Sequence, residues 1–147
     1  MNIDKNIKTL IVKKPLKLDC GKTIKNFPIA YETYGSLNSK KDNAILVFHA
    51  LTGDQFVTGI NPVTNKEGWW SYAVGADKAI DTNKYFVICS NVIGGCMGSY
   101  GPSHKNPDNQ NIFGKNFPVI TINDMVNAQY NLPVSYTHLT LPTKDSV

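Results

Sequence analysis

Asn43-Ala-Ile-Leu-Val-Phe48 runs directly into His49-Ala-Leu-Thr-Gly-Asp54, and this junction decides the fold of the 147-residue chain. The first part is almost continuously apolar and bounded by polar residues, which is typical of a short strand covered on both faces. Tyr85-Phe-Val-Ile-Cys89 has the same character. Two such strands indicate a central sheet with helices around it, so we expect an α/β fold.

The amino-terminal region predicts an opening pair of strands. Leu16-Lys-Leu18 and Pro28-Ile-Ala-Tyr-Glu-Thr-Tyr34 flank the turn-forming Asp19-Cys-Gly-Lys22. Residues of these types between two apolar runs favour an antiparallel hairpin. We therefore expect these two runs to pair with each other.

Two long segments, 51–80 and 94–117, are rich in glycine, proline and asparagine and show no sustained helical period. Long loops at the ends of buried strands are where α/β proteins place their sites. Thr121-Ile-Asn-Asp124 resembles a capping box with Asp in the usual Glu position. It predicts a helix that begins there.

Composition excludes several classes of function. The net charge is +4, and the lysines that carry it are scattered, so we expect no nucleic-acid partner. The start of the chain does not have the pattern of a secretory signal, and no apolar run approaches the ~20 residues that span a bilayer. Cys20, Cys89 and Cys96 lack metal-ligand spacing, so we expect no metal site. Together these features favour a cytoplasmic protein.

The last residues have a different origin in our interpretation. Back-translated in one frame, Pro133-Val-Ser-Tyr-Thr-His-Leu-Thr-Leu-Pro-Thr143 spells the transposon end and adjoining adapter of common sequencing libraries. Segments of that kind are excluded from reasoning about fold. We expect residues 1–132 to be natural and residues 133–147 to be an adapter-derived tail. The alternative is a real, threonine-rich, extended tail.

The segment after the first buried strand has one candidate chemical role. A tight loop there can aim backbone N–H groups into a cleft, as an oxyanion hole does in acyl transfer. The alternative is that His49 is a strand-end histidine with its hydrogen bonds satisfied and Gly53 a turn residue.

Gly94-Gly-Cys-Met-Gly98 matches a nucleophile elbow in which Cys96 replaces serine. An elbow requires a strand before it and a helix after it. Ser99-Tyr-Gly-Pro102 follows and cannot propagate a helix. A glycine-rich loop that packs beside the site is therefore the favoured interpretation.

Trp69 and Trp70 have two interpretations as well: they could wall a pocket or pack against the sheet edge.

Several uncommon short motifs occur in one order, and the resemblance described next rests on them together. They are His49–Asp54, Asn61-Pro62, Gly68-Trp-Trp70, Tyr85–Cys89, Asn91, Gly94–Gly98, Gly101-Pro102 and Phe117–Met125. From about Leu16 to Leu132 the chain resembles the amino-terminal third of the homoserine O-acetyltransferases, an α/β-hydrolase-fold family of methionine biosynthesis. Residues 1–132 would then be the amino-terminal portion of an α/β-hydrolase domain. Tyr100 and Ser71 depart from the family, which often has Thr and Asp there.

The resemblance implies ping-pong acyl transfer, in which a serine activated by a His–Asp pair takes acetyl from acetyl-CoA and passes it to L-homoserine. Acetyl-CoA is a co-substrate, and no bound cofactor is implied. Leu51 is the best candidate for a backbone oxyanion donor, with Thr52 beside it. The serine, aspartate and histidine would lie beyond this chain, so we expect no catalytic residue in it and no activity. A homodimer of the full-length form stays open.

Alternatives remain at this point. Homoserine O-succinyltransferase or serine O-acetyltransferase activity fits the same fold, because the regions that select acyl donor and acceptor are not present. A Cys96-dependent hydrolase and a fragment without function are the others.

Overall fold

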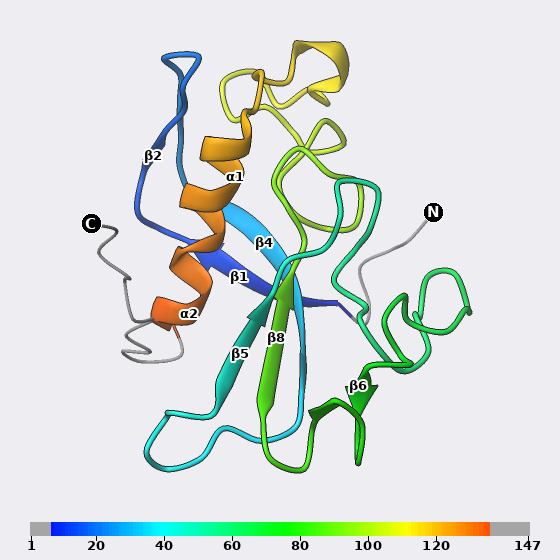
Figure 1. Cartoon of the computed structure of the whole chain (residues 1–147). Helices are drawn as coiled ribbons and strands as arrows, with labels where there is room; N and C mark the ends of the chain where they lie inside the picture. Colours follow the sequence, from blue (N-terminus) through cyan, green and yellow to red (C-terminus); the bar gives the residue numbers. More distant parts are fainter. Residues whose placement is uncertain (1–6, 136–147) are drawn as a thin grey trace.

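The computed structural model describes residues 7–135, and its centre is one sheet of four strands (Figure 1). The strands lie in the order β1-β4-β8-β5, with bounds Lys8–Val12, Phe27–Tyr34, Phe86–Ser90 and Ala44–Val47. β4 is antiparallel to both of its neighbours, whereas β5 is parallel to β8. The two strands predicted to be buried therefore lie side by side and point the same way.

β8 confirms the predicted buried strand with its bounds shifted by one residue: every residue from Phe86 to Ser90 is buried, whereas Tyr85 lies outside the strand and is 40% exposed. β5 confirms the predicted strand but not the predicted cover on both faces. Ala44, Ile45 and Leu46 are only half-buried, and Phe48 is 57% exposed. The physical reason is position: in the described part of the chain β5 pairs with β8 alone and forms the sheet edge.

The opening hairpin was predicted with the wrong partner. Leu16–Lys17 (β2) pairs with Thr23–Ile24 (β3) around the expected turn. The longer strand β4 pairs instead with β1, with Leu10 opposite Ile29. The turn was recognised because its residues are local signals. The β1–β4 pairing was missed because it joins residues far apart in sequence.

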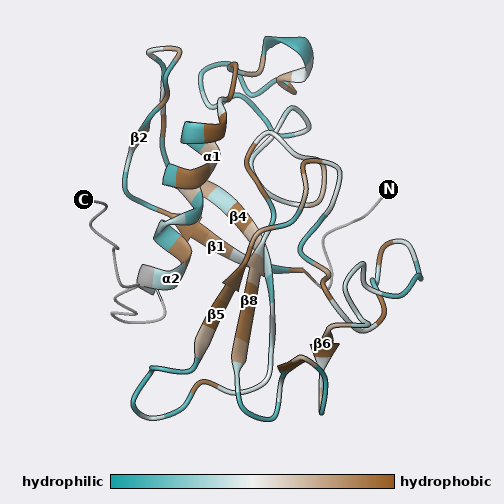
Figure 2. Cartoon of the chain, in the orientation of Figure 1, coloured by the Kyte–Doolittle hydropathy of each residue, from teal (hydrophilic) through white to brown (hydrophobic). Residues whose placement is uncertain are grey.

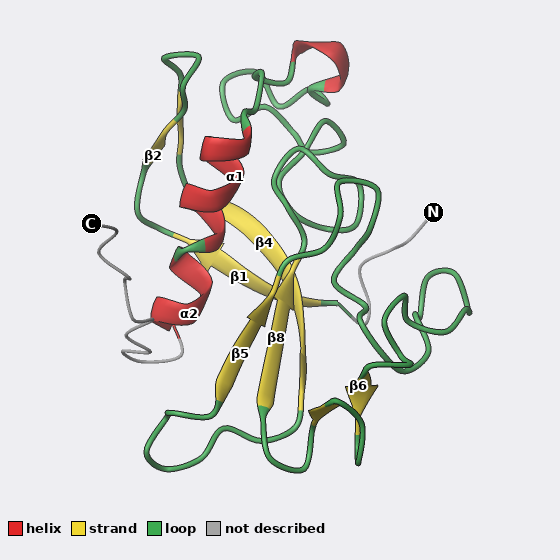
Figure 3. Ribbon diagram, in the orientation of Figure 1, coloured by secondary structure: helices red, strands yellow, loops and turns green. Residues whose placement is uncertain are grey.

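The two faces of the sheet are covered differently, as the alternation along β8 requires. Val87 and Cys89 pack with Val57 and Val74 of the long loop between β5 and β8. This loop contains two short parallel strands, β6 (Val74–Gly75) and β7 (Ile80–Asp81). The irregular character expected for 51–80 and 94–117 is otherwise confirmed, with one short 3-10 helix, η1 (Gly114–Asn116) (Figure 3).

Helices cover the opposite face, where Phe86 and Ile88 of β8 pack with Leu132. These helices are α1 (Ile122–Gln129) and α2 (Asn131–Ser135), which follow each other along the sheet (Figure 1). The predicted capping box is present: the Thr121 side chain accepts from the Asp124 N–H, and the Asp124 carboxylate accepts from the Thr121 N–H. Figure 2 shows the strongly apolar character of β5 and β8 between these layers.

Asp124 also ties α1 to the opening hairpin. One of its oxygens accepts from the backbone N–H of Asp19 at 2.9 Å, and the side chain is fully buried. Asp19 returns the contact by accepting from the Thr121 hydroxyl and the Asn123 amide, which lowers the pKa of its carboxyl. The start of the helix is thus fixed by hydrogen bonds from both sides.

The predicted adapter-derived tail begins inside α2, since Pro133–Ser135 belong to that helix, and its remainder, 136–147, lies outside the described residues. Within residues 7–135, no helix is long and apolar enough to cross a membrane. No group of histidine, cysteine and acidic side chains in that same range could hold a metal ion.

Candidate active site

The candidate site lies where the parallel strands β5 and β8 end. The carboxyl ends of parallel strands meet at one edge of a sheet, which is the usual position of ligand sites in α/β folds. His49 follows β5 and Asn91 follows β8, and both side chains are buried. The structure therefore brings together two of the segments that the sequence singled out.

A tight turn follows His49. The Gly53 N–H donates to the Ala50 carbonyl at 2.7 Å. Nδ1 of His49 lies 2.6 Å from the same carbonyl oxygen. Because a carbonyl oxygen only accepts, Nδ1 carries the proton of this hydrogen bond.

Leu51 and Thr52, the predicted oxyanion-hole residues, form the tip of this turn. The Leu51 side chain is 72% exposed. Within residues 7–135, the backbone N–H groups of Leu51 and Thr52 donate no hydrogen bond. Free N–H groups at the carboxyl end of a strand are what an oxyanion hole requires.

Asp54 closes the loop, and its importance was missed from the sequence. Its carboxylate accepts from the Phe56 N–H and from the Asn61 side-chain amide, both at 2.9 Å. Its carbonyl accepts from the Trp69 indole N–H at 2.9 Å. The one available signal in the sequence was the residue type, because Asp side chains in turns commonly accept a hydrogen bond from the backbone N–H two residues later.

The tryptophans pack against each other rather than opening a pocket. The rings of Trp69 and Trp70 are stacked, with centroids 5.7 Å apart and planes 10° from parallel. Trp70 also packs against the apolar cluster under the loop. Of the two interpretations given to this pair, a pocket wall or packing against the sheet edge, these contacts favour packing.

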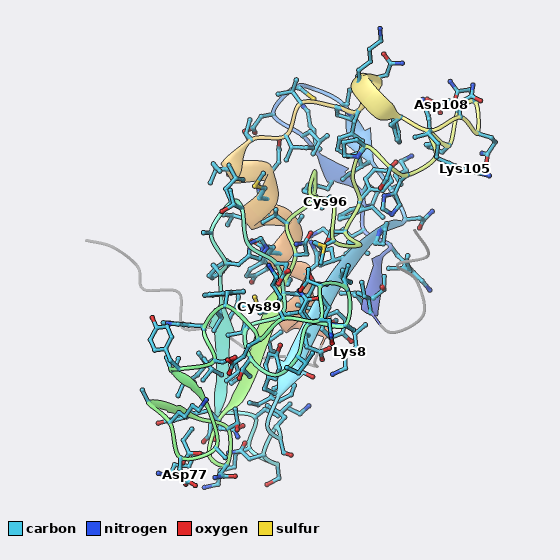
Figure 4. All side chains as sticks on the ribbon, turned by 90° about the vertical axis from the view of Figure 1, so that its right-hand side faces the viewer. Lys8, Asp77, Cys89, Cys96, Lys105 and Asp108 are labelled. Carbon is cyan, nitrogen blue, oxygen red and sulfur yellow. The ribbon has the colours of Figure 1, made fainter. Side chains whose placement is uncertain are left out.

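Cys96 does not sit in a nucleophile elbow. β8 ends at Ser90, and turns and bends occupy the chain on both sides of Cys96, without a following helix. The thiol is exposed in the loop region, whereas Cys89 lies within the molecule (Figure 4). Burial raises the pKa of the Cys89 thiol to about 12, so Cys89 is held as a neutral thiol.

Ser99, the near match to a serine elbow, is a buried bridge. Its hydroxyl donates to the Asn91 carbonyl at 2.7 Å and accepts from the Ala30 N–H at 2.9 Å. It therefore ties the end of β8 to β4. A serine occupied in this way by backbone groups on both sides has no free hydroxyl proton to give up.

Two buried side-chain amides complete the neighbourhood, and no pattern in the sequence predicted their roles. Gln55 donates to the Met97 carbonyl at 3.1 Å, which joins the two long loops. The side-chain oxygens of Gln55 and Asn91 accept no hydrogen bond within the described part of the chain. Both amides lie where the loops after β5 and β8 converge.

A hollow of about 320 Å³ opens beside the loop, between β4 and the segment after Asp54. Glu32 and Tyr34 of β4 line one wall, and Phe56, Thr58 and Ile60 are among the residues on the other. Glu32 is ion-paired with Lys8 at 2.5 Å. The Tyr34 oxygen accepts from the Val57 N–H at 3.1 Å, and burial raises the pKa of the phenol to about 12.

Comparison with known proteins gives close relatives. The chain is 76% identical over 132 residues to a homoserine O-acetyltransferase of Pelagibacter ubique and 63% identical over 116 residues to one of Nitrobacter hamburgensis. These matches cover 90% and 79% of this chain but 36% and 29% of the relatives. The chain thus spans about a third of the length of the curated relatives it matches. No protein-family model matches it.

Solved structures agree on the fold. Esterase E22 matches with a TM-score of 0.78 and 32% identity, over 89% of this chain and 37% of that one. A homoserine O-acetyltransferase from Bacillus anthracis matches with a TM-score of 0.77 and 31% identity, over 89% and 36%. The strands and loops described above therefore form part of an α/β-hydrolase fold.

Proposed function

We propose, from the premise that this chain is the amino-terminal part of an α/β-hydrolase of the homoserine O-acetyltransferase type, that the whole protein moves an acetyl group from acetyl-CoA to L-homoserine. The observation that carries the proposal is the 76% identity to the Pelagibacter ubique relative over 132 residues. The free N–H groups of Leu51 and Thr52 at the end of β5 support it independently.

The chemistry follows the two half-reactions of acyl transfer. The histidine takes the proton of the serine hydroxyl as its oxygen attacks the thioester carbonyl. That proton passes to the leaving sulfur, coenzyme A departs as the thiol, and an acyl-serine ester forms. The homoserine hydroxyl then attacks that ester and releases O-acetylhomoserine and the free serine. In both steps negative charge develops on the carbonyl oxygen. We assign the Leu51 N–H to stabilise this charge, with Thr52 next to it.

The serine, its histidine and its aspartate are expected in the part of the protein beyond this chain. For that reason we expect the 147-residue chain alone to form no acyl-enzyme, since members of a triad act as a unit. Incubation with acetyl-labelled acetyl-CoA followed by mass spectrometry measures this. A stoichiometric acetyl adduct on the native chain would contradict the expectation. The proposal requires no bound cofactor, and a homodimer of the whole protein is compatible with it.

Ester hydrolysis is a second candidate, because esterase E22 matches the fold as well as the Bacillus anthracis transferase does. The same acyl-serine would then pass its acetyl group to water. Hydrolysis and transfer share the first half-reaction and differ in the acceptor, so product analysis separates them.

The test uses a chimera in which residues 1–132 of this chain are joined to the remainder of the Pelagibacter ubique relative. The chimera is offered acetyl-CoA or succinyl-CoA as donor and homoserine, serine or water as acceptor. We expect O-acetylhomoserine as the main product. Because the regions that select donor and acceptor come from the relative, the chimera tests whether residues 1–132 of this chain supply a working amino-terminal part of that enzyme. A folded chimera that makes no O-acetylhomoserine would contradict the proposal.

The same chimera tests the cysteine alternative. Cys96→Ala should leave acetyl transfer within about twofold of the unsubstituted chimera, because an exposed thiol outside an elbow contributes no nucleophile. Loss of the acyl-enzyme in this variant would instead identify Cys96 as the nucleophile.

A further inference from the structure

The Ala50–Leu51 peptide unit connects a buried histidine to the proposed oxyanion donor. A trans peptide is planar, and its C=O and N–H bonds point in opposite directions. Whatever holds the Ala50 carbonyl therefore also fixes the direction of the Leu51 N–H. That carbonyl accepts two hydrogen bonds, whereas the Leu51 N–H donates none in the described residues.

The two donors to the Ala50 carbonyl come from opposite ends of the turn. The Gly53 N–H lies 2.7 Å from the oxygen, and His49 Nδ1 lies 2.6 Å from it. The Gly53 contact belongs to the turn itself. The His49 contact is added by a side chain, and it is short enough to restrict the carbonyl strongly.

The far side of the imidazole faces Asn91. Its Nε2 lies 3.5 Å from the Asn91 side-chain amide nitrogen, which is a long contact. His49 is 9% exposed and Asn91 is 2% exposed, so protein rather than water surrounds both groups. The ring thus spans from the loop after β5 to the end of β8.

The close fit around Gly53 shows how little room is left beside the hydrogen bond between His49 and the Ala50 carbonyl. A Cβ placed at Gly53 would lie 3.2 Å from the Ala50 oxygen and 3.2 Å from the His49 Cβ. Either contact is tighter than most real Cβ contacts. A residue larger than glycine would therefore press on the hydrogen bond between His49 and Ala50.

We propose that His49 is a positioning residue: its Nδ1–H anchors the Ala50 carbonyl, and Asn91 supports its ring, so that the Leu51 N–H is held in the direction needed for oxyanion stabilisation. This inference rests on the proposed function. His49 acts through the peptide and does not touch the reacting atoms. Its role is to fix the donor before the charge develops, which is how preorganised donors lower a barrier.

The test exploits the two ring positions in the chimera. In His49→Asn the amide nitrogen takes the place of Nδ1, whereas in His49→Gln it takes the place of Nε2. His49→Phe keeps a ring and has no donor. We expect kcat to fall about tenfold or more in the Phe and Gln variants and substantially less in the Asn variant, with KM for acetyl-CoA within about twofold. His104→Gln is the matched control, because it removes a histidine from another loop, and kcat should not change.

Equal losses in the Asn and Gln variants would mean that His49 only fills space, and an unchanged kcat in the Phe variant would overturn the inference outright. A spectroscopic readout does not depend on turnover. In chimera labelled with ¹⁵N-histidine, the His49 signals, identified by their absence in His49→Asn, should report a ring protonated at Nδ1. A ring protonated only at Nε2 overturns the inference.

Failure of the two proposals is distinguishable. If the unsubstituted chimera makes O-acetylhomoserine but the His49 variants behave alike, the function stands and the positioning role falls. If the unsubstituted chimera folds but makes no product, the function falls. The position of the ring proton then decides the inference. A proton on Nδ1 supports the hydrogen bond from His49 to the Ala50 carbonyl, and a proton only on Nε2 refutes it.

Discussion

Tyr34→Phe removes a single oxygen atom from the support of the site loop. That oxygen accepts the Val57 N–H at 3.1 Å and also a hydrogen bond from the backbone of Thr58. The ring remains, so packing against the cluster beneath the loop is kept. The change therefore isolates the contribution of these hydrogen bonds.

The magnitude follows from what each N–H can do afterwards. The Val57 N–H also donates to the Gln55 carbonyl at 3.1 Å, so it keeps one partner. Thr58 loses its partner but is half-buried, and water can reach it in part. An unpaired, fully buried donor costs about 1–3 kcal/mol, so we expect a loss of about 1–2 kcal/mol in the free energy of unfolding.

Urea unfolding of the chimera and of its Tyr34→Phe variant measures this difference. Tyr72→Phe is the matched control, because its oxygen accepts one hydrogen bond from the Trp70 indole at an 80% exposed side chain. The control should change stability by less than about 0.5 kcal/mol. Equal effects in the two variants would refute the reasoning.

Alkaline titration gives a second check on Tyr34. Its pKa is raised to about 12 by burial, whereas an unperturbed tyrosine ionises near ~10. The folded-state pKa lies above the unfolded value. The stability that Tyr34 contributes is therefore complete below about pH 10 and is lost as pH rises through about 12. In Tyr34→Phe this dependence should weaken and leave the share of Cys89, whose pKa burial also raises to about 12. An unchanged dependence would contradict the role given to Tyr34.

Other predictions test the same framework. In Gly68→Ala the new Cβ would lie 2.5 Å from the Thr58 backbone nitrogen, so we expect a loss of about 1–3 kcal/mol in the chimera and altered tryptophan fluorescence; normal stability would contradict the tight loop. Asp124→Ala removes two hydrogen bonds from backbone N–H groups and should lower the free energy of unfolding by about 2–4 kcal/mol, as measured with urea. The exposed control Asp108→Ala should lower it by less than about 0.5 kcal/mol. In the native 147-residue chain iodoacetamide should alkylate Cys20 and Cys96 but spare Cys89, as judged by peptide mass spectrometry; equal labelling of all three would contradict the buried position of Cys89.

Local signals carried the successful structural predictions. β8, the capping box at Thr121 and the irregular loops were each readable from adjacent residues. The pairing of β1 with β4 was not, because neither strand carries a local signal for its partner and no short turn joins them. The cover expected over β5 was also wrong, because burial of an edge strand depends on what lies beyond it.

The site divides in the same way. The position of the His49–Asp54 turn at a strand end followed from the sequence. The hydrogen bond from His49 to the Ala50 carbonyl did not, because a ring that folds back onto the next residue leaves no spacing pattern. The Asp54 junction and the buried amides of Gln55 and Asn91 likewise depend on contacts between loops. Sequence located the loop, and three-dimensional contacts gave its residues their roles.

Replacement of the Leu51 N–H by an ester oxygen in the chimera tests the central claim most directly. The substitution keeps the side chain and deletes the proposed donor, and it also makes the Ala50 carbonyl a weaker acceptor for His49 and Gly53. Loss of one oxyanion-hole donor typically lowers kcat by about 10²–10³-fold, and we expect that loss with little change in KM for acetyl-CoA. The same ester at Val119, a 73% exposed loop position, should leave kcat unchanged. A Leu51 ester variant that acetylates homoserine at the rate of the unsubstituted chimera would contradict the account.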